Sequence, residues 1–176
     1  MKKLKTSELN RLNVDEYKLS KKLPIIILLD NIRSMHNVGS VFRSSDAFLI
    51  EKIILCGFTP RPPHRDIHKT ALGATESVDW EYSADIQGTI SRLKKNNYII
   101  VGLEQADEQI SLEEFIPKSN EKYVIILGNE LTGIHEEIMN DLDLCLEIPQ
   151  YGTKHSLNVS VAAGIMMYHL SKYLKK

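Results

Sequence analysis

Five runs of apolar residues, separated by polar or amphipathic segments, follow one another along the chain. Four of the runs are continuous, as is typical of strands buried on both faces of a sheet. The fifth alternates apolar and polar positions, and Pro149 ends it because proline cannot donate a hydrogen bond to a neighbouring strand. The runs predict strands at residues 25–30, 52–58, 97–103, 122–129 and 144–149.

The segments between these runs carry helical patterns. Helices are predicted at residues 39–48, 86–96 and 134–141 and from about residue 158 onward, with a less regular piece at 69–78. Strands that alternate with helices predict an α/β fold, with a mainly parallel sheet of five to six strands and helices on both of its faces.

The last helix has apolar residues at helical spacing in two rows and a glycine, Gly164, in its interior. An interior glycine costs about 1 kcal/mol relative to alanine, which predicts a close approach of another backbone. The two rows are Val161, Ile165 and Tyr168 in one, and Ala162, Met166 and Leu170 in the other.

Length and composition favour a single folded unit. At 176 residues, 43% of them hydrophobic, the chain is long enough for one well-buried core and short for two. We therefore expect one domain at residues 23–176, preceded by a polar, partly helical arm at 1–22. The net charge of -1 means that a polyanionic partner must bind at a local basic patch.

The two cysteines, Cys56 and Cys145, lie in strand-like runs without metal-ligand spacing, so buried reduced thiols are the best interpretation. No apolar run approaches the roughly 20 residues needed to span a bilayer, and the N-terminus has no signal-peptide pattern. We expect a cytoplasmic protein with no membrane segment.

Three familiar ligand-binding motifs are incomplete or absent. GNELTG at 128–133 has the two glycines of a phosphate-binding loop, but Ile134 and His135 stand where lysine and a hydroxyl residue are required. No G-x-G-x-x-G opens a helix. His64 and His68 lie in the proline-rich stretch 59–68 without a third ligand, so we expect no metal site.

Three other segments each follow a predicted strand, are rich in glycine and asparagine, and carry one or two charged residues: 31–43, 127–134 and 148–165. In a parallel sheet all three meet at the carboxyl ends of the strands, where ligands bind in α/β proteins. Ser156 and Asn158 are also suited to cap the last helix, because their side chains can accept hydrogen bonds from its first N–H groups. Ligand binding and helix capping can coexist.

These three segments, and above all SLNVSVAAGI at 156–165, resemble the signature motifs of the SPOUT superfamily, specifically the TrmH-type RNA ribose 2′-O-methyltransferases. The resemblance spans about residues 24–173. It implies an S-adenosylmethionine cofactor, an RNA substrate (tRNA or rRNA), a homodimer and a deep C-terminal trefoil knot. Periodicity and spacing give no sign of the knot.

The resemblance also implies roles for particular residues. The catalytic set is Arg43, Asn37, Glu130, Ser156 and Asn158. The cofactor-binding set is Leu103, Gly128, Ile148, Leu157 and, again, Ser156.

Outside the motifs, Arg61, Arg65 and Lys69 form a basic cluster, which we interpret as candidate phosphate contacts to RNA. A ribose 2′-hydroxyl is a poor nucleophile, so the protein must align it and assist loss of its proton. Arg43 is expected to clamp the adjacent phosphate and polarise this hydroxyl, because an arginine guanidinium stays protonated. Two alternatives stay open: a non-catalytic knotted RNA-binding protein, and methylation of a base nitrogen.

Overall fold

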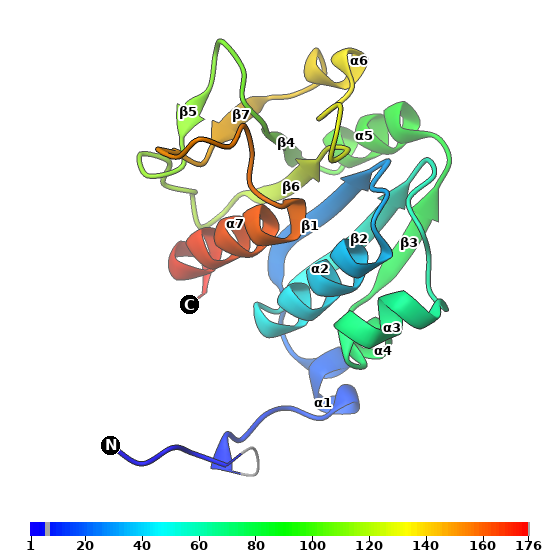
Figure 1. The fold of residues 1–176 in the computed structure, drawn as a ribbon, viewed down its shortest axis with the longest axis vertical. Helices are drawn as coiled ribbons and strands as arrows, with labels where there is room; N and C mark the ends of the chain where they lie inside the picture. The colour runs from blue at the N-terminus through cyan, green and yellow to red at the C-terminus, as the bar shows by residue number, and fades with distance from the viewer. Residues whose placement is uncertain (6–7, 176) are drawn as a thin grey trace.

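The apolar runs form the centre of a seven-stranded sheet in which all neighbouring strands are parallel, in the order β3-β2-β1-β6-β4-β7-β5. The computed structural model describes residues 1–5 and 8–175 (Figure 1). The strands are β1 Leu23–Asp30, β2 Ile50–Cys56, β3 Trp80–Ser83, β4 Tyr98–Leu103, β5 Ile110–Ser111, β6 Lys122–Leu127 and β7 Leu144–Glu147. The predicted α/β fold with a parallel sheet is confirmed.

The expected count of five to six strands is wrong, because two short strands were missed. Strand β3 has partly exposed residues and β5 has only two residues, and each lies at an edge of the sheet. An edge strand is covered on fewer sides, so it lacks the continuous apolar run that identifies β1 and β6.

Helices cover both faces of the sheet (Figure 1). Along β1, Ile25 and Ile27 point into the core beneath one helical layer, while Ile26 and Leu28 point into the core beneath the other. The first layer holds α2 Met35–Ala47, α3 Arg65–Ala71, α4 Ala74–Ser77 and α7 Val159–Leu174, and the second holds α5 Ile86–Lys95 and α6 Glu136–Met139.

Several predicted helix boundaries differ from the observed ones. The helix predicted from residue 39 begins at Met35, because Ser34 caps it by accepting a hydrogen bond from the Asn37 N–H at 3.3 Å. The helix predicted at 134–141 shrinks to the four residues of α6. The loop predicted at 59–68 ends earlier, since α3 begins at Arg65.

Helix α7 matches its prediction, but its two apolar rows differ in burial. Met166 and Leu170 are buried in the core. The other row stays on the surface, where Val161, Ile165 and Tyr168 are 51%, 38% and 64% exposed. A Cβ on Gly164 would make only an ordinary contact, 3.8 Å from Ser44 Oγ of α2, so the interior glycine is not required for helix packing.

Helix α1 Val14–Leu19 lies in the N-terminal segment and contacts α4. Tyr17 is buried, whereas Leu9, Leu12 and Leu19 are exposed.

Cys56 is buried, and burial raises the pKa of its thiol to about 12, so this thiol stays protonated. Within residues 1–5 and 8–175, none of the helices combines the length and apolarity that a bilayer crossing requires.

Candidate functional site

A cavity of about 840 Å³ opens at the carboxyl edge of the sheet, between the ends of β4, β6 and β7 and the start of α7. All five residues of the expected cofactor-binding set line it: Leu103, Gly128, Ile148, Ser156 and Leu157. The parallel arrangement of the strands explains this meeting, because each strand delivers its following loop to the same edge.

The loop that follows β6 is folded back on itself. Asn129 and Gly133 exchange two backbone hydrogen bonds, of 3.0 and 2.9 Å, and Gly133 has a φ of +67°. A Cβ on Gly128 would collide with the backbone of Gly133 and Ile134. Gly128 is therefore required by the loop itself, and enlarging it would disrupt the loop before it obstructed the cavity.

Glu104, the residue after β4, was missed in the sequence although it carries a charge directly beyond a strand end. Its Oε2 accepts a hydrogen bond from the Ile134 N–H at 3.0 Å, and its Oε1 accepts one from the Gln105 N–H at 2.9 Å. The carboxylate thereby ties the loop after β6 to the end of β4 on the cavity wall.

Three residues of the expected catalytic set form a continuous hydrogen-bonded chain. Asn37 Nδ2 donates to Glu130 Oε1 at 2.9 Å, and Asn158 Nδ2 donates to Asn37 Oδ1 at 3.1 Å. Glu130 and Asn158 line the cavity. The chain therefore connects the start of α2, the loop after β6 and the start of α7, which are the three motifs identified in the sequence.

Glu130 also binds the turn that precedes α2. Its carboxylate accepts hydrogen bonds from the backbone N–H groups of Arg33 at 2.9 Å and Ser34 at 3.1 Å. Burial acts to raise the pKa of Glu130, but the hydrogen bonds from Arg33, Asn37 and Ser34 outweigh it, so the pKa lies below its usual value. Glu130 is therefore held as a carboxylate.

Asn158 caps α7 and also contacts a second motif. Its Oδ1 accepts a hydrogen bond from the Ser160 N–H at 2.8 Å, which caps α7, while its amide reaches Asn37. Ser156 is exposed and lines the cavity two residues earlier.

Arg43 lies apart from this chain of hydrogen bonds. It is exposed on α2 and does not line the cavity, and its side chain has no hydrogen bond or ion pair in the described part of the chain. Six residues along a helix correspond to about 9 Å of rise and one and two-thirds turns, so Arg43 and Asn37 point to different sides of α2. The arginine is free to contact a ligand outside the cavity.

The candidate RNA contacts lie beside α2. Arg65 and Lys69 are exposed and one turn apart on α3, and Arg61 precedes them in the loop. Helices α2 and α3 pack closely because Gly39 has no side chain: a Cβ there would collide with Thr70 Oγ1 and the Ile67 carbonyl oxygen.

A buried carboxylate lies at the end of β1. Asp30 is 1% exposed, and its Oδ2 lies 3.8 Å from Nδ1 of His135, which lines the cavity. Burial raises the pKa of Asp30, against the opposing effects of His135 and of the Asn31 amide, which donates to Oδ1 at 2.7 Å.

Comparison with known proteins identifies relatives of this chain. A profile of the SpoU rRNA methylase family matches residues 24–168. A Staphylococcus saprophyticus protein assigned by name to the TrmH family of tRNA/rRNA methyltransferases is 30% identical over 89% of this chain and 62% of the relative. The 23S rRNA (guanosine-2′-O-)-methyltransferase RlmB of Neisseria meningitidis is 28% identical over 82% of this chain and 56% of its own length. The chain thus spans less than two thirds of both relatives.

Solved structures share the fold. The A. aeolicus TrmH/SpoU tRNA modifying enzyme superposes with a TM-score of 0.82 at 25% identity, covering 92% of this chain and 81% of that one. An AdoMet-bound rRNA methyltransferase from Sinorhizobium meliloti has a TM-score of 0.80 at 24% identity, covering 92% and 60%. At 24% identity, the likeness to the Sinorhizobium meliloti structure is evidence for a shared fold only.

Proposed function

Because the chain belongs to the SpoU rRNA methylase family, we propose that it is an S-adenosylmethionine-dependent RNA methyltransferase that modifies a ribose 2′-hydroxyl in tRNA or rRNA. The observation that carries the proposal is the hydrogen-bonded chain of Glu130, Asn37 and Asn158, which joins all three family-like motifs at the rim of one cavity. Relatives named as 2′-O-methyltransferases of rRNA support the choice of the ribose.

The cavity suits S-adenosylmethionine in size and chemistry. A volume of about 840 Å³ lies in the range of small-molecule sites. Leu103, Ile148 and Leu157 offer apolar surface for a purine ring, and the carboxylates of Glu104 and Glu136 offer negative charge to a cationic ligand. When bound, this cofactor supplies an electrophilic methyl group on a positively charged sulfur.

The protein's own side chains then have to position the RNA. In our proposal Arg43 binds the phosphate beside the target ribose and polarises the 2′-hydroxyl, and that phosphate accepts the proton. Because a guanidinium stays protonated, Arg43 acts as a clamp and not as a base. Asn37, near the start of α2, fixes this helix to the cavity rim through Glu130.

Arg65 and Lys69 extend the proposed phosphate-binding surface from α2 onto α3. Such contacts add affinity that falls with salt, without reading the base sequence. We place residues 23–176 in the catalytic unit and assign residues 1–22 to an accessory arm. An RNA-modifying role and two free thiols also fit a cytoplasmic location.

Two further features belong to the same proposal. A homodimer would cover the exposed row of Val161, Ile165 and Tyr168 on α7. A trefoil knot would thread the C-terminal segment through the connection between β4 and β6. Contacts of that connection with the segment support the knot: Gln105 Nε2 donates to the His155 carbonyl at 3.0 Å, and His169 Nε2 lies 2.7 Å from the Phe115 carbonyl.

Two substitutions separate chemistry from cofactor binding. Arg43→Ala is expected to abolish methyl transfer while the dissociation constant for S-adenosylmethionine changes less than twofold. Thr132→Trp, in an exposed position that lines the cavity, is expected to weaken cofactor binding at least tenfold, about 1.4 kcal/mol. Cofactor binding is measured by calorimetry in the presence of EDTA, and transfer with tritiated cofactor and unfractionated tRNA or rRNA.

Two controls accompany these variants. Arg43→Lys keeps the charge but loses the planar fork, so intermediate activity is expected. Arg92→Ala removes an exposed arginine on α5, in the opposite helical layer, and activity should stay at the wild-type value. Resistance of the product to alkaline cleavage next to the label identifies a 2′-O-methyl group. Label on a base nitrogen, or RNA binding without transfer, would replace our assignment with one of the two alternatives.

A further inference from the structure

The loop between β2 and α3 presents an aromatic side chain that the core does not use. The Phe58 side chain is 61% exposed, although hydrogen bonds hold the loop at Phe58 and Thr59. The Phe58 N–H donates to Asn31 Oδ1 at 3.0 Å, and the buried Thr59 donates from Oγ1 to the Leu29 carbonyl at 3.1 Å. Phe58 is therefore displayed by an anchored loop.

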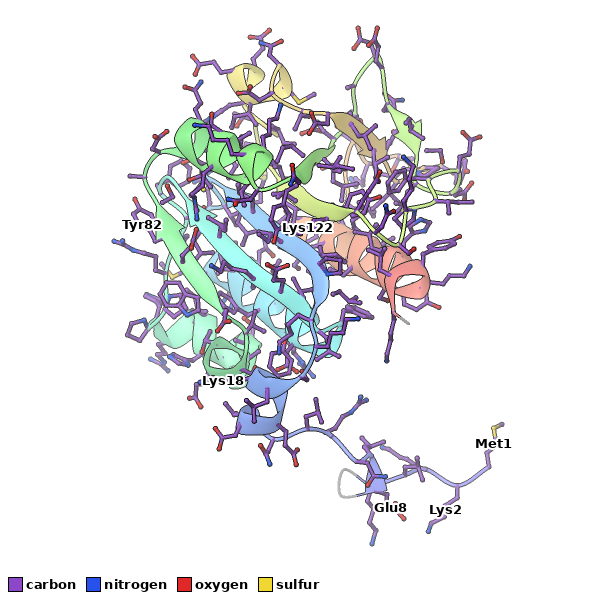
Figure 2. The ribbon with its side chains drawn as sticks, turned by 180° about the vertical axis from the view of Figure 1, so that it is seen from behind. Met1, Lys2, Glu8, Lys18, Tyr82 and Lys122 are labelled. Carbon is purple, nitrogen blue, oxygen red and sulfur yellow. The ribbon has the colours of Figure 1, made fainter. Side chains whose placement is uncertain are left out.

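A second aromatic group lies close to the same loop. Tyr82 is 38% exposed on the edge strand β3, at the outer edge of the molecule (Figure 2), and the guanidinium carbon of Arg61 lies 4.1 Å from its ring centroid. The Gly57 N–H donates to the Ser83 carbonyl at 3.2 Å, which joins the loop carrying Phe58 to the end of β3. We call Phe58, Arg61 and Tyr82 the aromatic platform.

The chemistry of this surface matches unpaired nucleotides. Nucleobases stack on aromatic rings and on the planes of arginine guanidinium groups, and nearby cations bind the flanking phosphates. Residues 57–65 contain Arg61, Arg65 and His64 and no aspartate or glutamate, so nothing in the loop repels a phosphate.

The loop is also tied to the cavity. Asn31, which holds the Phe58 N–H, accepts a hydrogen bond at its own carbonyl from Asn129 Nδ2 at 2.7 Å. Asn129 lines the cavity between Gly128 and Glu130. Hydrogen bonds through Asn31 therefore link the backbone of Phe58 to the loop after β6, which lines the cavity.

We propose that the aromatic platform stacks an unpaired base of the RNA substrate close to the target nucleotide, so that the substrate is a single-stranded loop or bulge and not a continuous duplex. The inference rests on the proposed function, since it assigns the structural class of that RNA. Arg61 then acts mainly through stacking, while Arg65 and Lys69 contact phosphates.

Filter binding of unfractionated tRNA at several salt concentrations tests the proposal. Phe58→Ala and Tyr82→Leu are each expected to weaken RNA binding about tenfold at every salt concentration, because stacking involves no released counterion. Arg65→Ala is expected to weaken binding at low salt and to lower the salt slope by about one. Phe58→Tyr keeps a ring and should bind nearly as well as wild type, and Leu19→Ala removes a remote exposed side chain as a control.

Calorimetry with S-adenosylmethionine and thermal melting separate the possible failures. All variants should keep the wild-type cofactor affinity and melting temperature. Unchanged RNA affinity in Phe58→Ala and Tyr82→Leu would overturn the platform even if methyl transfer occurs, and a changed oligomeric mass would instead make the surface a protein contact. Absence of transfer by the wild-type protein would overturn the proposed function, while the RNA-binding comparison would still decide on the platform.

Discussion

At the scale of single residues, Glu130 fixes segments that lie far apart along the chain. Its carboxylate accepts three hydrogen bonds from the turn and first residues of α2, while the residue itself belongs to the loop after β6. Hydrogen bonds to a charged group contribute more to the stability of the fold than bonds between neutral groups. A donor that is left without its acceptor lowers this stability further.

We expect Glu130→Gln to lower the free energy of unfolding at pH 7 by about 1–2 kcal/mol, because a neutral amide accepts these bonds more weakly. Since the folded pKa of Glu130 lies below the unfolded value of 4.5, its stabilisation is fully present above pH 4.5 and is lost as the pH falls through the folded pKa. Urea unfolding followed at pH 7, 5 and 3.5 measures this. The difference in the free energy of unfolding between wild type and Glu130→Gln should shrink at the lowest pH. A difference that stays constant with pH would mean that the charge of Glu130 is not its cause.

The sequence identified Asn37, Glu130 and Asn158 through resemblance, but it could not give their pairing. Which donor meets which acceptor depends on the conformations of three separate loops, and no local pattern encodes that. Glu104 shows the same limit from the other side, since a charge after a strand is common and only the folded loop shows that it binds the Ile134 N–H. Arg43 was predicted with this group, yet helical geometry turns it away from Asn37.

At the scale of secondary-structure elements, the contact between α2 and α3 depends on Gly39, where added atoms would meet the backbone of α3. We expect Gly39→Ala to destabilise the protein by about 1–3 kcal/mol, although alanine favours helices, because the two helices would have to separate. Thermal unfolding measures the change. Gly164→Ala in α7 is the matched control, since a Cβ fits there, and it should leave stability unchanged or increase it. Equal effects at both glycines would contradict close packing at Gly39.

The elements that the sequence predicted well are those whose burial is complete. Strands β1 and β6 pair along their length, with Ile27 opposite Ile125, and both faces are covered, so their composition alone identifies them. Strand β3 was missed because Glu81 turns away from the core layer in which Trp80 packs, and four residues give too short an alternation. The loop at 59–68 was extended too far because its prolines concealed the helix start capped by His64.

At the scale of the whole molecule, the exposed apolar row of Val161, Ile165 and Tyr168 on α7 leads us to expect that two copies of the protein associate. We expect light scattering at micromolar concentration to give twice the chain mass of 20.1 kDa. Ile165→Glu places a charge in the middle of this row and should yield a monomer, because burying an unpaired carboxylate is costly. Leu19→Glu, at an exposed site on α1, serves as the control and should remain dimeric. A wild-type mass of about 20.1 kDa would remove the support for a dimer.

The position of β1 in the sheet also has a consequence during protein synthesis. One edge of β1 can pair with β2 soon after both leave the ribosome, but the other edge waits for β6, which follows only after residues 31–121 have been translated. Chains emerge from the N-terminus, and an unpaired apolar strand edge is a template for association with other chains. We therefore expect the yield of folded protein in a cell to depend on the rate of translation and on chaperones that cover β1 until Tyr123–Leu127 arrive.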